Sequence, residues 1–98
     1  MLTKQDIFKS IEENAELIKS YGVTEIGLFG SYVRNEQTEN SDIDILIHYS
    51  EAFSYRKFFD FCEMIEHLFP KKVDIVTKNG LSPFIGPHIL KEVNYVEI

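Results

Sequence analysis

Residues 42–48 (DIDILIH) constrain the fold of this chain more than any other segment. The segment is rich in isoleucine and alternates acidic and apolar residues at its start, which is typical of a β-strand. Side chains two apart on a strand lie on the same side of a sheet, so Asp42 and Asp44 are expected to project together. Ile43 and Ile45 then face the other way. The segment therefore predicts a sheet with an apolar core on one side and two acids on the other.

Helical and strand patterns alternate along the rest of the chain. We expect one helix that begins after Thr3, with Asp6 completing its capping box, and is closed by Gly22. The other expected elements are strands at Val23–Phe29 and Val73–Thr77, a helical turn at 31–34, a loop at 35–41, a connector at 50–54, helices at 55–69 and 88–92, and an edge strand at 94–97. This order predicts a single domain, residues 1–98, of the α/β or α+β class, with a small mixed sheet flanked by helices.

Composition and charge limit the possible partners. The formal net charge is -6 and the 10 Lys and Arg residues are scattered, with tight pairs only at 56–57 and 71–72. An acidic chain without a basic face is not expected to bind nucleic acid over an extended surface. The single cysteine, Cys62, excludes an internal disulfide, and no apolar run is long enough to cross a membrane. We therefore expect a cytoplasmic protein.

The helix at 55–69 carries several aromatic residues that can fill the core. The residues assigned to its apolar face are Phe58, Phe59, Cys62, Ile65, Leu68 and Phe69. Cys62 is then a packed core thiol. Phe61 lies outside this assignment, and we expect it to be exposed and to mark a partner surface.

The two acids of residues 42–48 are the first candidates for chemistry. Like charges side by side on a strand repel, and a pair of this kind is commonly kept because a cation bridges it. Oxygen ligands favour Mg²⁺ or Mn²⁺. Asp74 lies in another apolar strand, and if the two strands pair, Asp42, Asp44 and Asp74 can hold two metal ions for in-line phosphoryl transfer. Alternatively, Asp74 forms an ion pair with Lys71 or Lys72.

Gly30 and Ser31 follow a strand and begin a helical turn. Glycine lets a ligand approach the backbone, and the N–H groups of the turn suit an anion such as a phosphate. Arg34, one turn further on, either contacts the phosphates or fixes the loop by pairing with a carboxylate such as Glu36. Tyr32 and Tyr49, which flank the motif, are candidates to pack against a nucleotide base.

These residues carry a resemblance to a known family. Gly-Ser, ten residues and then Asp-x-Asp resembles the signature of the polymerase-β-like nucleotidyltransferase superfamily. The string GSYVRNEQTENSDIDILI, with Arg34 and Ser41 in place, is similar to its minimal nucleotidyltransferase branch. One departure is Asn35, where that branch commonly has glycine. Asparagine tolerates the left-handed backbone better than other non-glycine residues, so the turn is expected to survive.

The resemblance implies an activity and a partner. Members of this branch transfer AMP from ATP to a hydroxyl, and many are antitoxins that modify a small helical HEPN-type toxin. It implies that Gly30 and Ser31 hold phosphates and that Asp42, Asp44 and Asp74 bind the metals and form the catalytic site. Two alternatives remain: the same chemistry on a small molecule such as an antibiotic, and a non-catalytic module that inhibits its partner by contact. A template-directed polymerase is not expected, because there is no basic channel.

Overall fold

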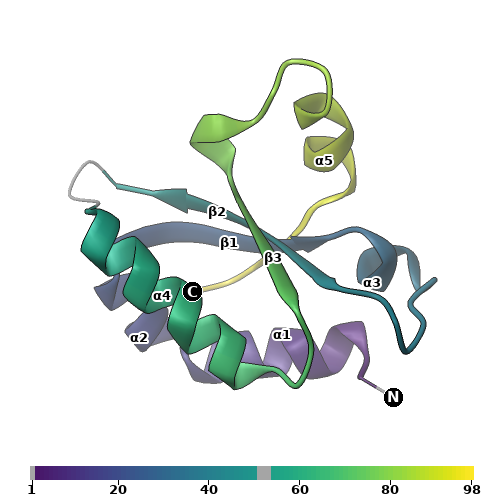
Figure 1. Cartoon of the computed structure of the whole chain (residues 1–98), viewed down its shortest axis with the longest axis horizontal. Helices are drawn as coiled ribbons and strands as arrows, with labels where there is room; N and C mark the ends of the chain where they lie inside the picture. The colour runs from purple at the N-terminus through teal and green to yellow at the C-terminus, as the bar shows by residue number, and fades with distance from the viewer. Residues whose placement is uncertain (1, 51–53) are drawn as a thin grey trace.

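A computed structural model describes residues 2–50 and 54–98, and its central feature is a four-stranded mixed sheet (Figure 1). The strands are β1 (Val23–Phe29), β2 (Ile43–Tyr49), β3 (Val73–Thr77) and β4 (Asn94–Val96), in the order β3-β2-β1-β4. β1 is antiparallel to both β2 and β4, whereas β2 and β3 are parallel. The predicted mixed sheet flanked by helices is therefore confirmed.

Helices cover mainly one side of this sheet. In Figure 1, α1 (Lys4–Glu13), α2 (Ala15–Ser20) and α4 (Tyr55–Leu68) lie on that side, and α5 (Gly86–Glu92) lies on the other. The short helix α3 (Ser31–Arg34) follows β1, and a 3₁₀ turn, η1 (Lys78–Gly80), follows β3. Of the expected connector 50–54, residues 51–53 lie outside the described part of the chain.

The first helix departs from the prediction. Thr3 and Asp6 form the expected capping box, and Gly22, with φ +89°, follows the end of the helical region. The region is nevertheless divided into α1 and α2 at Asn14, whose ψ of 16° is not helical. The Asn14 side chain donates to the carbonyl of Ser10 at 2.7 Å, an asparagine contact that competes with helix continuation. The single helix predicted from periodicity was therefore wrong.

The termini of other elements shift slightly. Asp42 lies just before β2, which extends to Tyr49, and α5 begins two residues earlier than expected, at Gly86. β4 ends at Val96, one residue before the predicted end. Helix and strand ends differ by a residue or two with small changes in hydrogen bonding, so these shifts do not alter the architecture.

The core lies between the sheet and the helices α1, α2 and α4. β2 contributes Ile43, Ile45 and Ile47, all fully buried, and its neighbour β1 contributes Ile26 and Leu28. The helices contribute the buried side chains of Ile7, Ile11, Ile18, Phe61 and Ile65. The alternation predicted for β2 is thus confirmed at Ile43 and Ile45.

The apolar face of α4 was assigned wrongly at two positions. Phe61 is fully buried, whereas Phe59 is 66% exposed. At 100° per residue, Phe61 lies within the arc spanned by Phe58, Ile65 and their neighbours, while Phe59 lies outside it. Cys62 is partly buried against the core, as expected, and burial raises the pKa of its thiol.

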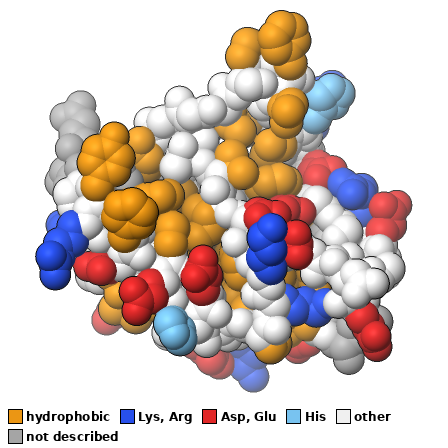
Figure 2. Space-filling view, in the orientation of Figure 1, with side chains coloured by type: hydrophobic (Ala, Val, Ile, Leu, Met, Phe, Trp, Pro, Cys, Tyr) orange, Lys and Arg blue, Asp and Glu red, His pale blue; other side chains and the backbone are white. Residues whose placement is uncertain are grey.

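The side of the sheet away from these helices is less covered. A Cβ on Gly27 would lie 2.6 Å from Cγ2 of Val93, so the chain leaving α5 packs tightly against β1 at this point. The hydrophobic side chains of Phe84, Ile85 and Leu90 are exposed on and before α5. Figure 2 shows hydrophobic side chains at the surface in the region where Figure 1 places α5. Within the described residues, none of the helices has the length and apolar character that a bilayer crossing requires.

Candidate active site

The three predicted carboxylates come from the start of two adjacent parallel strands. Asp44 of β2 is the register partner of Asp74 of β3, and Asp42 lies immediately before β2. Ile43 and Ile45 point into the core, so the alternation of the strand directs Asp44 to the opposite side. Figure 2 shows acidic side chains gathered on this side of the molecule around a basic one.

Lys72 lies between two of these acids. Its Nζ is 3.9 Å from Oδ2 of Asp42 and 3.7 Å from Oδ1 of Asp74. The Lys72 side chain is 72% exposed, and exposed pairs of this kind contribute little to stability. The ion pair weighed as an alternative for Asp74 is therefore present, but it leaves Asp74 beside Asp44.

The charges of the site act most strongly on Asp44. Burial, followed by the neighbouring Asp74 and Asp42, raises the pKa of Asp44 from 3.8 to about 6. Glu92 raises the same pKa further, whereas Arg34 lowers it. A half-buried carboxylate surrounded by other acids has the electrostatics of a cation site.

We tested whether these residues fit a divalent metal. Their donors are carboxylate oxygens, which suit Mg²⁺ or Mn²⁺, and Asp44 lies partly buried beside the two other acids. Among residues 2–50 and 54–98, however, no group of three or more His, Cys, Asp or Glu side chains is placed so that it could hold a metal ion. The oxygen donors suit a divalent metal in their chemistry, but in this structure no three of the described acids are grouped closely enough to hold one.

Gly30 connects β1 to α3 and packs directly against Asp44. Its φ of 81° and ψ of -154° belong to a region that is nearly restricted to glycine. A Cβ at this position would lie 2.2 Å from Oδ2 of Asp44. Gly30 therefore allows both the turn and the close approach of the backbone to the acid. The neighbouring Ser31 begins α3, as expected.

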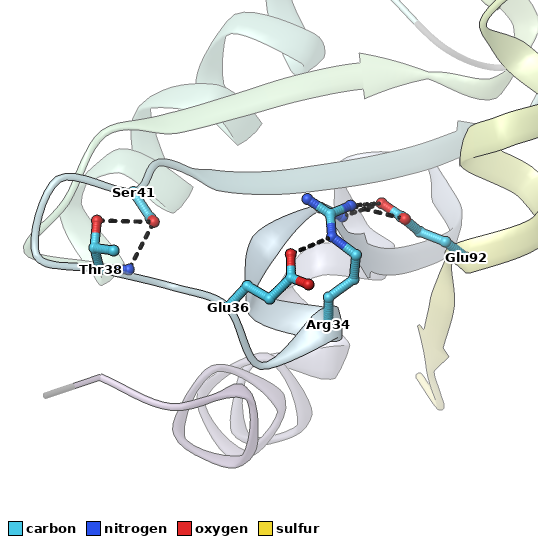
Figure 3. A network of polar contacts seen from close by, with 6 residues as sticks. Arg34, Glu36, Thr38, Ser41 and Glu92 are labelled. Atoms are coloured by element: carbon cyan, nitrogen blue, oxygen red, sulfur yellow. Dashed lines mark hydrogen bonds and ion pairs between the residues drawn. The ribbon is translucent and has the colours of Figure 1, made fainter.

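Arg34 is held by two carboxylates (Figure 3). Its Nε donates to Oε2 of Glu36 at 3.0 Å, so the predicted pair with Glu36 is confirmed. Its Nη1 also donates to both carboxylate oxygens of Glu92, at 3.0 and 2.9 Å. The same Oε1 of Glu92 accepts the backbone N–H of Gly30 at 2.6 Å.

Sequence reasoning did not identify Glu92. It lies 62 positions from Gly30 in the sequence, outside the string of residues that carries the resemblance. The resemblance gave no role for the glutamate. Only the pairing of β4 with β1 brings it to this turn.

The loop before Asp42 is ordered by its own polar groups. Oγ of Ser41 accepts the backbone N–H of Thr38 at 2.8 Å and lies 3.4 Å from the Thr38 hydroxyl (Figure 3). Asn35 has φ 58° and ψ 36°, so it adopts the left-handed conformation expected of it. These contacts fix the chain between α3 and β2, on which the relative positions of the turn and the acids depend.

Neither tyrosine supports the prediction of base packing. Tyr32 is 1% exposed and belongs to the core, so it cannot stack on a bound base. Tyr49 lies at the far end of β2 from Asp44, a separation of about 16 Å along an extended strand. Burial of Tyr32 follows from α3, which directs this side chain under the sheet instead of toward solvent.

Comparison with known proteins gives a consistent result. Residues 7–96 match the family model described as nucleotidyltransferase domain. The chain is similar to a protein adenylyltransferase, MntA, of Thermococcus cleftensis, with 43% identity over 97 residues that cover 98% of each chain. It is also 40% identical, over 98% of its length and 100% of the relative, to a Methanocaldococcus jannaschii protein assigned as a protein adenylyltransferase.

Solved structures share the fold. One assigned as a minimal nucleotidyltransferase superposes with a TM-score of 0.82, at 27% identity and 95% coverage of both chains. A toxin–antitoxin structure with AMP-PNP has a TM-score of 0.66 at 22% identity, covering 96% of this chain and 72% of that one. A Shewanella oneidensis complex of a tri-AMPylated HEPN toxin with its MNT antitoxin gives 0.63 at 17% identity, covering 89% and 68%.

Proposed function

Because this chain belongs to the nucleotidyltransferase domain family, we propose that it transfers AMP from ATP to a hydroxyl of a protein partner, a small helical HEPN-type toxin. The observation that carries the proposal is the pairing of Asp44 with Asp74, beside Asp42 and directly against the Gly30 turn. This arrangement brings a candidate cation site and a candidate phosphate site into contact.

The proposed reaction is a substitution at the α-phosphorus of ATP. The hydroxyl oxygen of the acceptor attacks this phosphorus, the bond to the bridging oxygen breaks, and pyrophosphate leaves. A carboxylate beside the acceptor takes the hydroxyl proton, and we assign this role to Asp74 because it lies at the outer strand of the pair, β3. The product is AMP joined to the partner through a phosphodiester bond.

We assign metal binding to Asp42, Asp44 and Asp74. When bound, Mg²⁺ or Mn²⁺, as two ions, would neutralise phosphate charge and stabilise the attacking and leaving oxygens. The carboxylates provide hard oxygen donors, and the raised pKa of Asp44 indicates negative charge that a cation would compensate. Lys72 must then release its weak contacts with Asp42 and Asp74.

We assign the phosphates of ATP to the turn formed by Gly30 and Ser31. The absence of a side chain on Gly30 lets its backbone lie directly against Asp44, and the N–H groups at the start of α3 favour an anion. Arg34 adds positive charge near the turn, but its two carboxylate partners favour a role in fixing the loop over direct phosphate contact.

The protein partner is inferred from the relatives. Similar chains are named as protein adenylyltransferases, and chains of the same fold occur in complexes with HEPN toxins. Genome context offers a first check, because a neighbouring short reading frame for a helical protein with an Arg-x₄-His motif would supply the partner.

Intact-mass analysis tests the activity directly. The purified chain, that partner, ATP and Mg²⁺ are incubated together, and we expect the partner to gain mass in whole AMP units. Asp42→Asn with Asp44→Asn keeps the size of both side chains and should abolish the gain. If this double variant modifies the partner as fast as wild type, the assigned site is wrong.

Two further assays with the same proteins separate the two alternatives. Inhibition of the partner by the double variant, without ATP and as effectively as by wild type, would favour a module that acts by contact. Rapid turnover on hydroxylated small molecules with no protein partner would favour an antibiotic-type transferase.

A further inference from the structure

Glu92 connects the C-terminal helix to the nucleotide site. Its Oε1 accepts the Gly30 N–H at 2.6 Å and an Arg34 Nη1–H at 3.0 Å, while Oε2 accepts from the same nitrogen at 2.9 Å. The Glu92 side chain is 28% exposed. A partly buried carboxylate that accepts three hydrogen bonds from two donor nitrogens, one of them charged, is firmly held.

The backbone of Glu92 is fixed by the sheet. β4 pairs with β1 so that Asn94 lies opposite Leu28, and continuing this antiparallel register by two residues places Glu92 opposite Gly30. The Asn94 side chain also donates to the Glu92 carbonyl at 2.9 Å. The Glu92 carboxylate thus continues the β1–β4 ladder where backbone pairing has ended.

Gly30 is consequently held from two sides. Asp44 occupies the space that a Cβ would need, and Glu92 accepts the N–H. The backbone angles of Gly30 are in a region that is strained for other residues and that persists only when surrounding contacts determine it. Of the described contacts at this turn, the one with Glu92 comes from the most distant part of the sequence.

We propose that Glu92 is a positioning residue for nucleotide binding, which accepts the Gly30 N–H and so presets the turn for the phosphates. This inference rests on the proposed function and adds a residue to that site. It differs from a role as an internal anion that occupies the site and must be displaced, because the register of β4 and the Arg34 contacts keep the carboxylate in place. Removing the Glu92 carboxylate should weaken ATP binding if Glu92 positions the turn. It should strengthen ATP binding if Glu92 competes with the phosphates.

Calorimetric titration with ATP and Mg²⁺ on folded variants tests the proposal. Glu92→Ala should weaken ATP binding roughly tenfold, since one lost hydrogen bond to a charged group has about that effect. Glu92→Gln keeps an acceptor oxygen for Gly30 and should stay within about threefold of wild type. Glu36→Gln, which removes a carboxylate from Arg34 without touching Gly30, should also stay within about threefold.

A kinetic readout separates positioning from a general loss of structure. In the transfer assay, Glu92→Ala should raise KM for ATP while KM for the protein acceptor stays constant, and Glu92→Gln should restore KM for ATP. Circular dichroism at the assay temperature checks that each variant is folded.

Two results would overturn the proposal. Unchanged or tighter ATP binding in Glu92→Ala would show that the carboxylate is dispensable or competes with phosphate. Equal weakening in the Ala and Gln variants would show that the charge, and not the contact with Gly30, is what matters. Neither of these results would contradict the proposed function. Wild-type protein that binds no ATP would refute the proposed function itself.

Discussion

At the residue scale, the site depends on one glycine lodged between two carboxylates. Gly30 lies against Oδ2 of Asp44 and donates its N–H to Glu92. Its lack of a side chain allows the close approach to Asp44, and its positive φ allows the turn. The pKa of Asp44 is in turn raised by burial and by the nearby acids. Both residues can be tested by single substitutions with matched controls.

Gly30→Ala should destabilise the protein and abolish transfer. The methyl group would meet Asp44, and the backbone strain alone costs about 1–3 kcal/mol. Gly22→Ala is the matched control, because Gly22 also has a positive φ of +89° but its added Cβ would be in ordinary contact, 3.7 Å from Oγ of Ser50. Urea denaturation and the AMP-transfer assay measure the two effects. Loss of activity in both variants would argue against a specific role for the space at Asp44.

Asp44 should make the stability of the metal-free protein depend on pH. Its pKa is 3.8 as the reference value and about 6 in the folded protein, so the folded state binds this proton more tightly. The favourable contribution of this proton to the free energy of unfolding is complete below pH 3.8 and is lost as the pH rises through about 6. In EDTA, wild type should therefore lose stability relative to Asp44→Asn across this window.

Urea denaturation at a series of pH values measures this difference. Asp60→Asn, on the exposed face of α4, serves as the control for a change of one charge elsewhere. The electrostatic account would be contradicted if the difference in free energy of unfolding between wild type and Asp44→Asn were independent of pH or became smaller as the pH rises.

At the element scale, α4 illustrates how a helix selects its buried face. The buried arc includes Phe61 and Ile65, with Phe58 and Cys62 partly buried, and excludes Phe59. The sequence alone could have placed Phe61 correctly, since an angle of 100° per residue puts it inside the arc. The break at Asn14 is different, because asparagine is tolerated within helices and only the observed contact with Ser10 shows the interruption.

Phe61→Ala and Phe59→Ala form a matched pair on this helix. Phe61 is fully buried, so its truncation should cost about 3–5 kcal/mol in the free energy of unfolding. Phe59 is 66% exposed, and its truncation should change stability by about 0.5 kcal/mol or less. Urea denaturation monitored by circular dichroism gives both values. Equal costs would mean that α4 packs in a different rotation.

At the scale of the whole molecule, the one-sided helical layer leaves the acids accessible. Helices α1, α2 and α4 cover the apolar side of the sheet (Figure 1). The strand alternation and register direct Asp44 and Asp74 toward the other side. A nucleotide and an acceptor can therefore approach the site without opening the core. The cost of this arrangement is a concentration of negative charge, which ligand binding should relieve.

Mg²⁺ should raise the melting temperature of wild type more than that of Asp42→Asn with Asp44→Asn. A ligand that binds only the folded state stabilises it by about 1.4 kcal/mol at roughly ten times its dissociation constant. Differential scanning calorimetry with MgCl₂, against KCl at equal ionic strength, measures the shift. An equal shift in both proteins would mean that the cation acts through general screening and not at these carboxylates.

The sequence by itself determined the features that depend on near neighbours. The bounds of Val23–Phe29 and Val73–Thr77, the Thr3 capping box and the outward direction of Asp44 follow from local propensity and alternation. Only the tertiary structure decided that Asp44 and Asp74 share a register, and that Glu92 reaches Gly30 across 62 positions. Such contacts depend on which strands pair, and strand pairing is settled by the packing of the whole core.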